Sequence, residues 1–274
     1  MERNTDPGML DPLGDEPLRI GTRTFTSRLL LGSGKYPSHE IMRAAHLASG
    51  TECVTVAVRR IDLGSRGPTL LDFIDRAKIT LLPNTAGCFT ADDAVRTARL
   101  GREAGLSELV KLEVLADPKT LLPDPIATLD AARQLVKEGF TVLAYTSDDP
   151  VIAQRLEQAG CAAVMPLGSP IGSGQGINNP RNITLIKSTL RCPVLVDAGV
   201  GTPSDVTLAF ELGIDGVLLN TAVALARDPV KMAAAVKHAY LAGRHGFLAG
   251  RIPVLETAQP SSPESGKIAA LGNA

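Results

Sequence analysis

The sequence contains no tryptophan, and aromatic residues make up only 3% of its 274 residues. Stacking platforms for bases are built from aromatic side chains, so no such platform is expected. Lys and Arg total 28 and Asp and Glu total 29, which gives a net charge of −1. A chain without an excess of positive charge lacks the electrostatic footprint of a protein that binds nucleic acid or an anionic membrane.

Long apolar runs, paired cysteines and clustered histidines are also missing. No stretch approaches the ~20 apolar residues that cross a bilayer, and residues 1–17 lack the apolar core of a secretory signal. The cysteines form no C-x-x-C pair, and the histidines show no metal-ligand spacing. We therefore expect a reduced, cytoplasmic protein with no metal site. The residues concerned are Cys53, Cys88, Cys161, Cys192, His39, His46, His238 and His245.

The two ends of the chain differ in composition from the middle. Residues 1–17 are rich in Pro, Gly and Asp, and residues 256–274 contain the run Gln-Pro-Ser-Ser-Pro-Glu-Ser-Gly. Such compositions are typical of flexible tails. No linker-like stretch interrupts residues 18–255, so a single domain is predicted between an N-terminal and a C-terminal tail.

Short β-branched apolar runs alternate with helical patterns along this domain. The runs are nearly continuous in hydrophobicity, as in strands of a parallel sheet covered on both faces. Eight strand–helix units favour a (β/α)8 barrel, with an open doubly wound sheet as the alternative. A G-x-G-x-x-G motif that would favour a dinucleotide-binding open sheet is absent. The predicted strands are 29–31, 53–58, 79–83, 109–114, 141–145, 162–167, 193–197 and 216–220.

Helix boundaries can also be predicted between these strands. Thr90, Asp149, Thr202 and Asp228 each offer a capping oxygen, and the last three precede a proline at the first helical position. Glycines follow several helical patterns at the place of a C-terminal cap. These glycines are Gly105, Gly139, Gly160 and Gly213.

Lys111 interrupts the apolar strand predicted over residues 109–114. Because side chains alternate along a strand, Lys111 and Glu113 share one face and point into the barrel. Burial lowers the pKa of an amine, and a neutral lysine is the nucleophile that forms a Schiff base. The negative charge of Glu113 has the opposite effect and raises the pKa of the lysine. The sequence does not show which of the two effects is larger. A structural Lys–Glu pair is an equal alternative, and Lys35 is a rival nucleophile in a glycine-rich loop.

The turns after the last two predicted strands are rich in glycine and small polar residues. Residues 197–203 (Asp-Ala-Gly-Val-Gly-Thr-Pro) and 220–222 (Asn-Thr-Ala) stand where barrels often bind phosphate. Tight turns without a ligand would also need these glycines. Residues 168–176 are predicted to form a mobile loop at the barrel mouth. Asp197 is predicted to act either as a second acid/base group or as a support for the turn that follows it.

Six short motifs follow one another along the predicted domain. They are residues 54–60 (Val-Thr-Val-Ala-Val-Arg-Arg), 82–88 (Leu-Pro-Asn-Thr-Ala-Gly-Cys), 110–114 (Val-Lys-Leu-Glu-Val), 168–174 (Gly-Ser-Pro-Ile-Gly-Ser-Gly), 196–201 (Val-Asp-Ala-Gly-Val-Gly) and 219–222 (Leu-Asn-Thr-Ala). In this order and spacing they resemble the bacterial thiazole synthase family of thiamine biosynthesis, and the resemblance runs from about Leu18 to Pro253.

The resemblance implies a (β/α)8 barrel that condenses 1-deoxy-D-xylulose 5-phosphate with dehydroglycine (2-iminoacetate) and sulfur. The sulfur comes from the C-terminal thiocarboxylate of a ubiquitin-like sulfur-carrier protein, and the product is thiazole phosphate carboxylate. The Schiff-base lysine then falls on Lys111 and the acid/base carboxylates on Glu113 and Asp197. A homotetramer and no metal or redox cofactor are also implied. The implied phosphate contacts are Gly172, Ala198, Gly199, Asn220 and Thr221.

Two other classes of function remain open from the residues. Another Schiff-base barrel that acts on a sugar phosphate, such as a class I aldolase or the pyridoxal phosphate synthase barrel, shares the Lys111 chemistry but needs no thiocarboxylate protein. A non-catalytic binding barrel would use Lys111 and Glu113 only to fill its interior.

Overall fold

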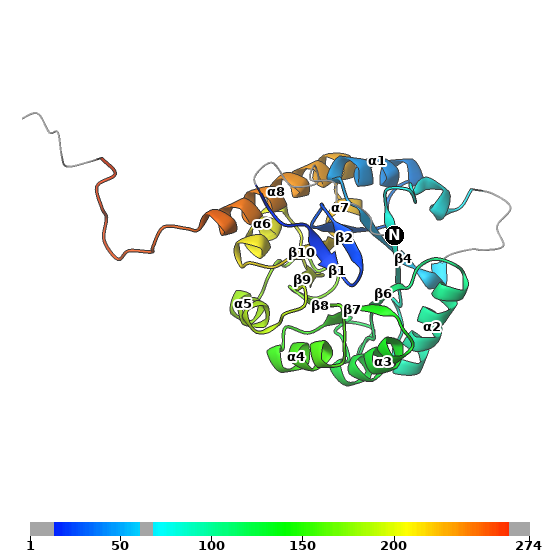
Figure 1. The fold of residues 1–274 in the computed structure, drawn as a ribbon. Helices are drawn as coiled ribbons and strands as arrows, with labels where there is room; N and C mark the ends of the chain where they lie inside the picture. Colours follow the sequence, from blue (N-terminus) through cyan, green and yellow to red (C-terminus); the bar gives the residue numbers. More distant parts are fainter. Residues whose placement is uncertain (1–13, 61–67, 263–274) are drawn as a thin grey trace, which may run out of the picture.

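The computed structural model describes residues 14–60 and 68–262, which form one closed β-barrel surrounded by helices (Figure 1). Parallel strands pair in the order β8-β7-β6-β5-β4-β3-β10-β9, and bridges from Val164 to Val194 and from Leu167 to Asp197 join β8 to β9. The predicted (β/α)8 barrel is therefore confirmed, and the open sheet is wrong. The strands are β3 (Leu29–Gly32), β4 (Cys53–Ala57), β5 (Thr80–Asn84), β6 (Leu109–Leu112), β7 (Thr141–Thr146), β8 (Ala163–Pro166), β9 (Leu195–Asp197) and β10 (Gly216–Leu219).

The helices pack around the outside of the barrel. Thr90, Asp149 and Asp228 accept hydrogen bonds from the first turns of their helices, and the predicted glycines at the helix ends have positive φ. Between β4 and β5 the described residues hold only the 3-10 turns η2 (Val58–Arg60) and η3 (Leu70–Phe73). The helices are α1 (His39–Ser49), α2 (Ala91–Glu103), α3 (Pro125–Lys137), α4 (Pro150–Gln158), α5 (Pro180–Thr189), α6 (Pro203–Glu211), α7 (Thr221–Ala224) and α8 (Pro229–Ala249).

A short antiparallel hairpin closes the end of the barrel where the strands begin (Figure 1). It consists of β1 (Leu18–Ile20) and β2 (Arg23–Phe25) and was not predicted. Its buried Leu18, Ile20 and Phe25 pack against the apolar side chains that fill the half of the barrel where the strands begin. Apolar side chains thus fill the barrel interior at this end.

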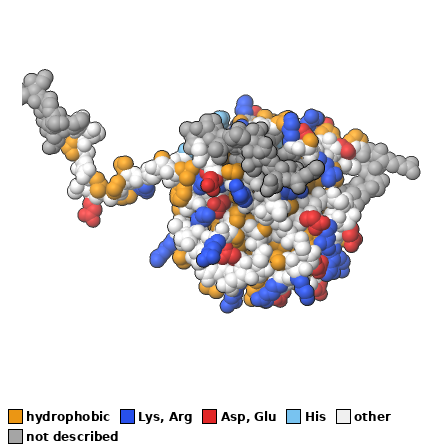
Figure 2. All heavy atoms as spheres, in the orientation of Figure 1, with side chains coloured by type: hydrophobic (Ala, Val, Ile, Leu, Met, Phe, Trp, Pro, Cys, Tyr) orange, Lys and Arg blue, Asp and Glu red, His pale blue; other side chains and the backbone are white. Residues whose placement is uncertain are grey.

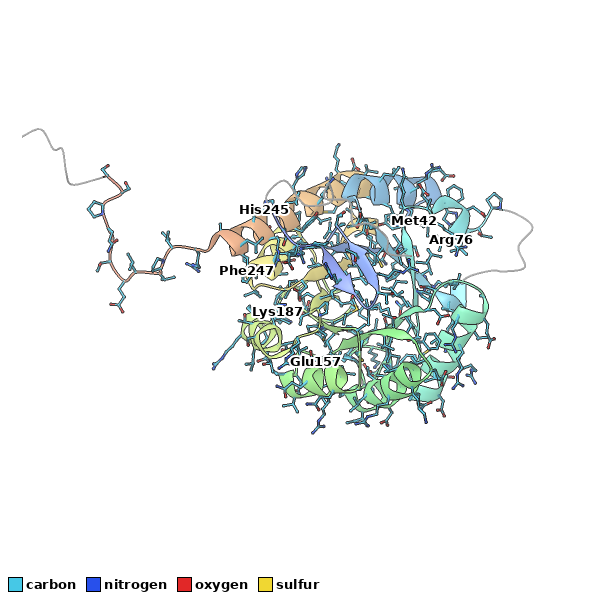
Figure 3. All side chains as sticks on the ribbon, viewed as in Figure 1. Met42, Arg76, Glu157, Lys187, His245 and Phe247 are labelled. Atoms are coloured by element: carbon cyan, nitrogen blue, oxygen red, sulfur yellow. The ribbon has the colours of Figure 1, made fainter. Side chains whose placement is uncertain are left out.

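Charged contacts anchor the beginning of β9, the strand that carries Asp197. Lys187 on α5 pairs with Asp215 at 2.7 Å, and Asp215 accepts the Val194 N–H at 2.8 Å. Glu157 on α4 accepts the backbone N–H groups of residues 191 and 192, each at 2.7 Å. Figure 3 shows Lys187 and Glu157 on neighbouring helices of the outer layer. β9 is therefore fixed by two helices.

Asp15 attaches the segment before β1 to the barrel. Its carboxylate accepts two hydrogen bonds from Arg28, which precedes β3, and two from Arg244 on α8, all between 2.8 and 3.0 Å. Burial alone would raise the pKa of Asp15, but the hydrogen bonds and charges of the two arginines outweigh it and lower the pKa to about 2.

The chain beyond α8 leaves the barrel as an extended segment with exposed apolar side chains (Figures 1 and 2). Ile252 and Val254 are 82% and 78% exposed. Residues 1–13 and 263–274 of the predicted tails lie outside the described residues, so the domain boundaries stay predictions. Within the described part of the chain, no helix combines the length and the apolarity that a membrane crossing requires.

We predict that Asp15→Asn lowers the free energy of unfolding by about 2 kcal/mol at pH 7, because a carboxylate with a depressed pKa stabilises the folded state. This contribution is complete above the ordinary pKa of 3.8 and is lost as the pH falls toward 2. Urea unfolding at a series of pH values between 7 and 3 measures it. Asp130→Asn, which breaks an exposed pair with Arg133, is the control and changes little. A loss that does not shrink at low pH would contradict the assignment.

Candidate active site

A cavity of about 1000 Å³ opens at the end of the barrel where the strands finish. Each residue predicted for the site lines it, so the structure brings together side chains that are far apart in the sequence. The lining includes Lys111, Glu113, Asp197, Gly172, Ala198, Gly199, Asn220 and Thr221. The rival Lys35 also lines the cavity but is exposed, whereas Lys111 is only 5% exposed.

The alternation along β6 directs Lys111 inward. Val110, Leu112 and Val114 are buried in the core between the strands and the helices. The strand ends at Leu112, earlier than predicted, yet Glu113 still faces the cavity. The Thr85 hydroxyl explains why, since it accepts the Glu113 N–H and donates to the Glu113 carbonyl, both at 2.8 Å.

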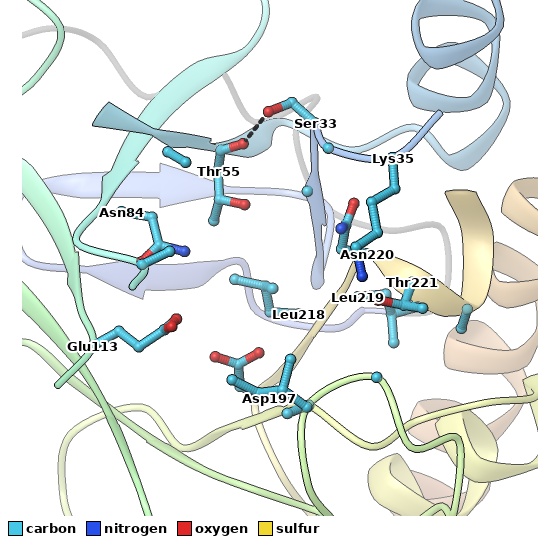
Figure 4. A pocket seen from close by; sticks show the side chains of 18 of the residues that line it. Ser33, Lys35, Thr55, Asn84, Glu113, Asp197, Leu218, Leu219, Asn220 and Thr221 are labelled. Carbon is cyan, nitrogen blue, oxygen red and sulfur yellow. Dashed lines mark hydrogen bonds between the residues drawn. The ribbon is translucent and has the colours of Figure 1, made fainter. Parts of the chain in front are cut away.

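Lys111 lies between two buried carboxylates. Its Nζ is 2.5 Å from Asp197 Oδ2 and 3.9 Å from Glu113 Oε2, and each of the three side chains is at most 7% exposed. Asp197 comes from β9, three strands away around the barrel from β6. Figure 4 shows the Glu113 and Asp197 carboxylates directed into the same space.

The structure shows which of the two opposing effects on the pKa of Lys111 is larger. Burial alone would lower the pKa of its ammonium group, but the negative charges of Asp197 and Glu113 outweigh burial and raise that pKa. The lysine is therefore protonated in the free protein. Burial and the charge of Asp197 raise the pKa of Glu113, against the lowering effect of Lys111. A carboxyl group with a raised pKa suits proton transfer near neutral pH.

Two polar groups beside this triad were missed by the sequence analysis. The Tyr145 ring lies with its centroid 5.6 Å from Lys111 Nζ, and its buried hydroxyl has no hydrogen-bond partner among the described residues. Asn84, which pairs with Lys111 in the register of β5 and β6, donates to the Glu113 carboxylate. Asn84 lies in the motif of residues 82–88 and Tyr145 ends the strand predicted over residues 141–145, but nothing in the sequence singled out either side chain for a role at the site.

The glycine-rich turns after β9 and β10 meet on the side of the cavity that lies away from Glu113 and Asn84 (Figure 4). Ala198 and Gly199 both have left-handed backbone, with φ of +70° and +79°. A Cβ atom at Gly199 would lie 1.9 Å from Ser169 Oγ, so only glycine allows the turn after β9 to pack against the loop of residues 168–176. Lys35 extends toward Asn220 and Thr221 on the same side (Figure 4).

Cys88, near the end of β5, is buried. Its Sγ atom accepts from Arg59 Nη2 at 3.4 Å and lies 3.4 Å from Thr97 Oγ1. The part of the chain that the structure describes contains no group of three or more His, Cys, Asp or Glu side chains with the arrangement of a metal site.

Comparison with known proteins identifies the family. The family model for "Thiazole biosynthesis protein ThiG" matches residues 19–263. The chain belongs to the ThiG family of thiazole synthases. It is 62% identical to the thiazole synthase of Myxococcus xanthus (strain DK1622), over 93% of this chain and 98% of that protein. It is 63% identical to the thiazole synthase of Geobacter sulfurreducens, over 92% and 98% of the two chains.

These matches confirm the predicted family and its enzymatic class, thiazole synthesis for thiamine. Among solved structures, the fold resembles a chain in the BexX/CysO complex of Amycolatopsis orientalis with a TM-score of 0.80 and 35% identity. That match covers 89% of this chain and all of the other. The roles predicted for individual residues in the thiazole synthase reaction stay predictions.

We predict that Lys111→Met lowers the free energy of unfolding by about 3–5 kcal/mol at pH 8, because it leaves two buried carboxylates without a counter-charge. The loss shrinks toward pH 5, since Glu113, with its raised pKa, takes up a proton. The raised pKa of Lys111 keeps the lysine charged throughout this range. Urea unfolding at both pH values measures the effect, with Lys35→Met as the control. A loss independent of pH would show that the carboxylates do not cause it.

Proposed function

We propose that this thiazole synthase condenses 1-deoxy-D-xylulose 5-phosphate, dehydroglycine and sulfur from a carrier-protein thiocarboxylate through an imine on Lys111. The observation that carries the proposal is the position of Lys111 Nζ, which is buried at the base of the cavity, 2.5 Å from Asp197 and 3.9 Å from Glu113. No other lysine among the described residues that line the cavity is buried.

Asp197 takes the first proton in this scheme. Lys111 is an ammonium ion in the free protein, and only a neutral amine attacks a ketone. The Asp197 carboxylate is in direct contact with the ammonium and accepts its proton. The amine then adds to the ketone carbon of the sugar, and loss of water from the carbinolamine gives a protonated imine.

Glu113 serves the later proton transfers. The protonated imine makes the adjacent carbon acidic, so a base that removes its proton allows the carbonyl group to migrate along the sugar. Glu113 lies beside Lys111, and its raised pKa lets the same carboxyl group accept and return a proton. The thiocarboxylate sulfur then adds to the migrated carbonyl carbon, and the oxygen of that carbon leaves with the carrier protein as a carboxylate. Condensation with dehydroglycine closes the ring with loss of water and returns the Lys111 amine.

The phosphate is assigned to the glycine-rich side of the cavity. Gly172, Ala198, Gly199, Asn220 and Thr221 line it, and the left-handed turn at Ala198 and Gly199 leaves no side chain between the backbone and a bound oxyanion. The Lys35 ammonium extends toward the same place and adds positive charge (Figure 4).

A sulfur-carrier protein is the proposed partner. The structure of BexX was solved as a complex with CysO, and a protein of this fold therefore binds a second protein. The cavity opens at the ends of the strands, and a C-terminal tail inserted there would bring the thiocarboxylate to the sugar imine. The homotetramer implied by the family resemblance stays a prediction.

We predict that borohydride treatment in the presence of 1-deoxy-D-xylulose 5-phosphate traps a covalent adduct on Lys111. Peptide mass spectrometry locates the modified lysine. Lys111→Arg keeps the positive charge between the carboxylates but forms no imine, so it gives no adduct, while Lys35→Arg gives the wild-type adduct. An adduct on Lys35, or an unchanged yield in Lys111→Arg, would contradict the proposal.

We predict that substitutions of the two carboxylates separate the early and late steps. Glu113→Gln still traps the sugar imine but loses thiazole formation by about 10²–10⁴-fold, the usual worth of a general acid/base. Asp197→Asn slows the trapping itself, because the proton acceptor for Lys111 is gone. Rates of adduct formation and of product formation measure the two effects. Equal losses of trapping in both variants would contradict the division of roles.

A further inference from the structure

The cavity mouth carries positive charges that the imine chemistry does not use. Lys35, Arg59 and Arg60 line it, whereas the acidic residues among its described lining, Glu113 and Asp197, lie buried beside Lys111. The reaction proposed above brings a phosphate, a carboxylate and a thiocarboxylate to this one opening. Each of these anions needs a partner of opposite charge.

The two arginines of η2 point to different sides of the mouth. Arg60 lies toward the phosphate side. A Cβ atom added to Gly34 would be 3.8 Å from Arg60 Nη1 and also 3.8 Å from Asn220 Nδ2, so both side chains approach Gly34. Arg59 turns the other way and donates to the Gly87 carbonyl at 2.9 Å and to Cys88 Sγ at 3.4 Å. These two contacts fix the guanidinium of Arg59 beside the turn after β5.

Gly87 connects Arg59 to the reacting centre. Its carbonyl accepts from Arg59, and its N–H donates to the Glu113 carboxylate. The guanidinium and the proposed acid/base group are therefore separated by one residue. Two N–H groups of Arg59 are engaged in its contacts with the turn, and a guanidinium has five, so donors remain for a ligand.

Asn84 supplies a second, independent indication of a ligand at this place. Asn84 lines the cavity, and its Oδ1 atom is buried and has no hydrogen-bond partner among the described residues. A buried acceptor without a donor is costly unless a ligand provides one. Figure 4 shows Asn84 beside Glu113, on the side of the cavity away from Asn220 and Thr221.

We propose that Arg59, Asn84 and Glu113 form the subsite for dehydroglycine, with its carboxylate on Arg59 and its imine N–H on Asn84 Oδ1. This assignment rests on the proposed function and extends it to the second small substrate. Dehydroglycine is a two-carbon carboxylate with an imine N–H, so its donor and acceptor groups match those offered by Asn84 and Arg59. Glu113 would then lie between the two substrates, where it can move protons for both.

Steady-state kinetics with dehydroglycine formed from glyoxylate and ammonia test the subsite, at saturating sugar phosphate and carrier thiocarboxylate. Arg59→Gln is expected to raise the KM for dehydroglycine on the order of 10- to 100-fold, as for the loss of one charge-assisted hydrogen bond. Arg59→Lys retains part of the affinity, and Asn84→Ala also raises this KM. The matched control is Arg60→Gln, which raises the KM for the sugar phosphate instead.

Borohydride trapping with the sugar alone separates failure of the subsite from failure of the proposed function. Arg59→Gln should give the wild-type yield of the Lys111 adduct, because Arg59 does not touch the sugar. An equal loss of trapping in Arg59→Gln would show a structural role and overturn the subsite. An increased KM for the carrier protein alone would assign Arg59 to the thiocarboxylate tail and overturn it as well. Absence of any adduct in the wild-type protein would refute the imine mechanism itself.

Discussion

The ion pair between Lys111 and Asp197 is the contact on which the chemistry of the cavity depends. Two carboxylates surround one ammonium in a place that is closed to water on most sides. Removal of Lys111 would leave both buried carboxylates without a counter-charge, so the lysine holds the three side chains together. The same arrangement stores the proton that must leave Lys111 before it can attack a ketone.

The barrel creates this contact by closure. Lys111 and Asp197 stand on β6 and β9, and only the bridges between β8 and β9 bring the two strands to opposite sides of one interior. The hairpin of β1 and β2 fills the other end of the barrel with Leu18, Ile20 and Phe25. The polar groups of the site therefore lie toward the ends of the strands, where the glycine-rich turns and the Arg59 side form two separate flanks.

Much of this arrangement could be predicted from local sequence patterns. The alternation of Val110, Lys111 and Leu112 predicts the inward lysine, and the capping residues predict the helix starts because both depend on neighbours in the chain. The raised pKa of Lys111 could not be predicted, since it requires the distance to Asp197 across the barrel. The buried Tyr145 hydroxyl and the free Asn84 oxygen also lacked a sequence signal, because burial at those positions depends on packing between distant segments.

A crystal structure with 1-deoxy-D-xylulose 5-phosphate bound would test the central claim most directly. The account predicts continuous electron density from Lys111 Nζ to the ketone carbon of the sugar, with the phosphate on the turns at Ala198 and Thr221. Arg59 would remain free of the sugar. A sugar bound with its ketone carbon away from Lys111, or with its phosphate on Arg59, would contradict both the imine and the division of the cavity into two flanks.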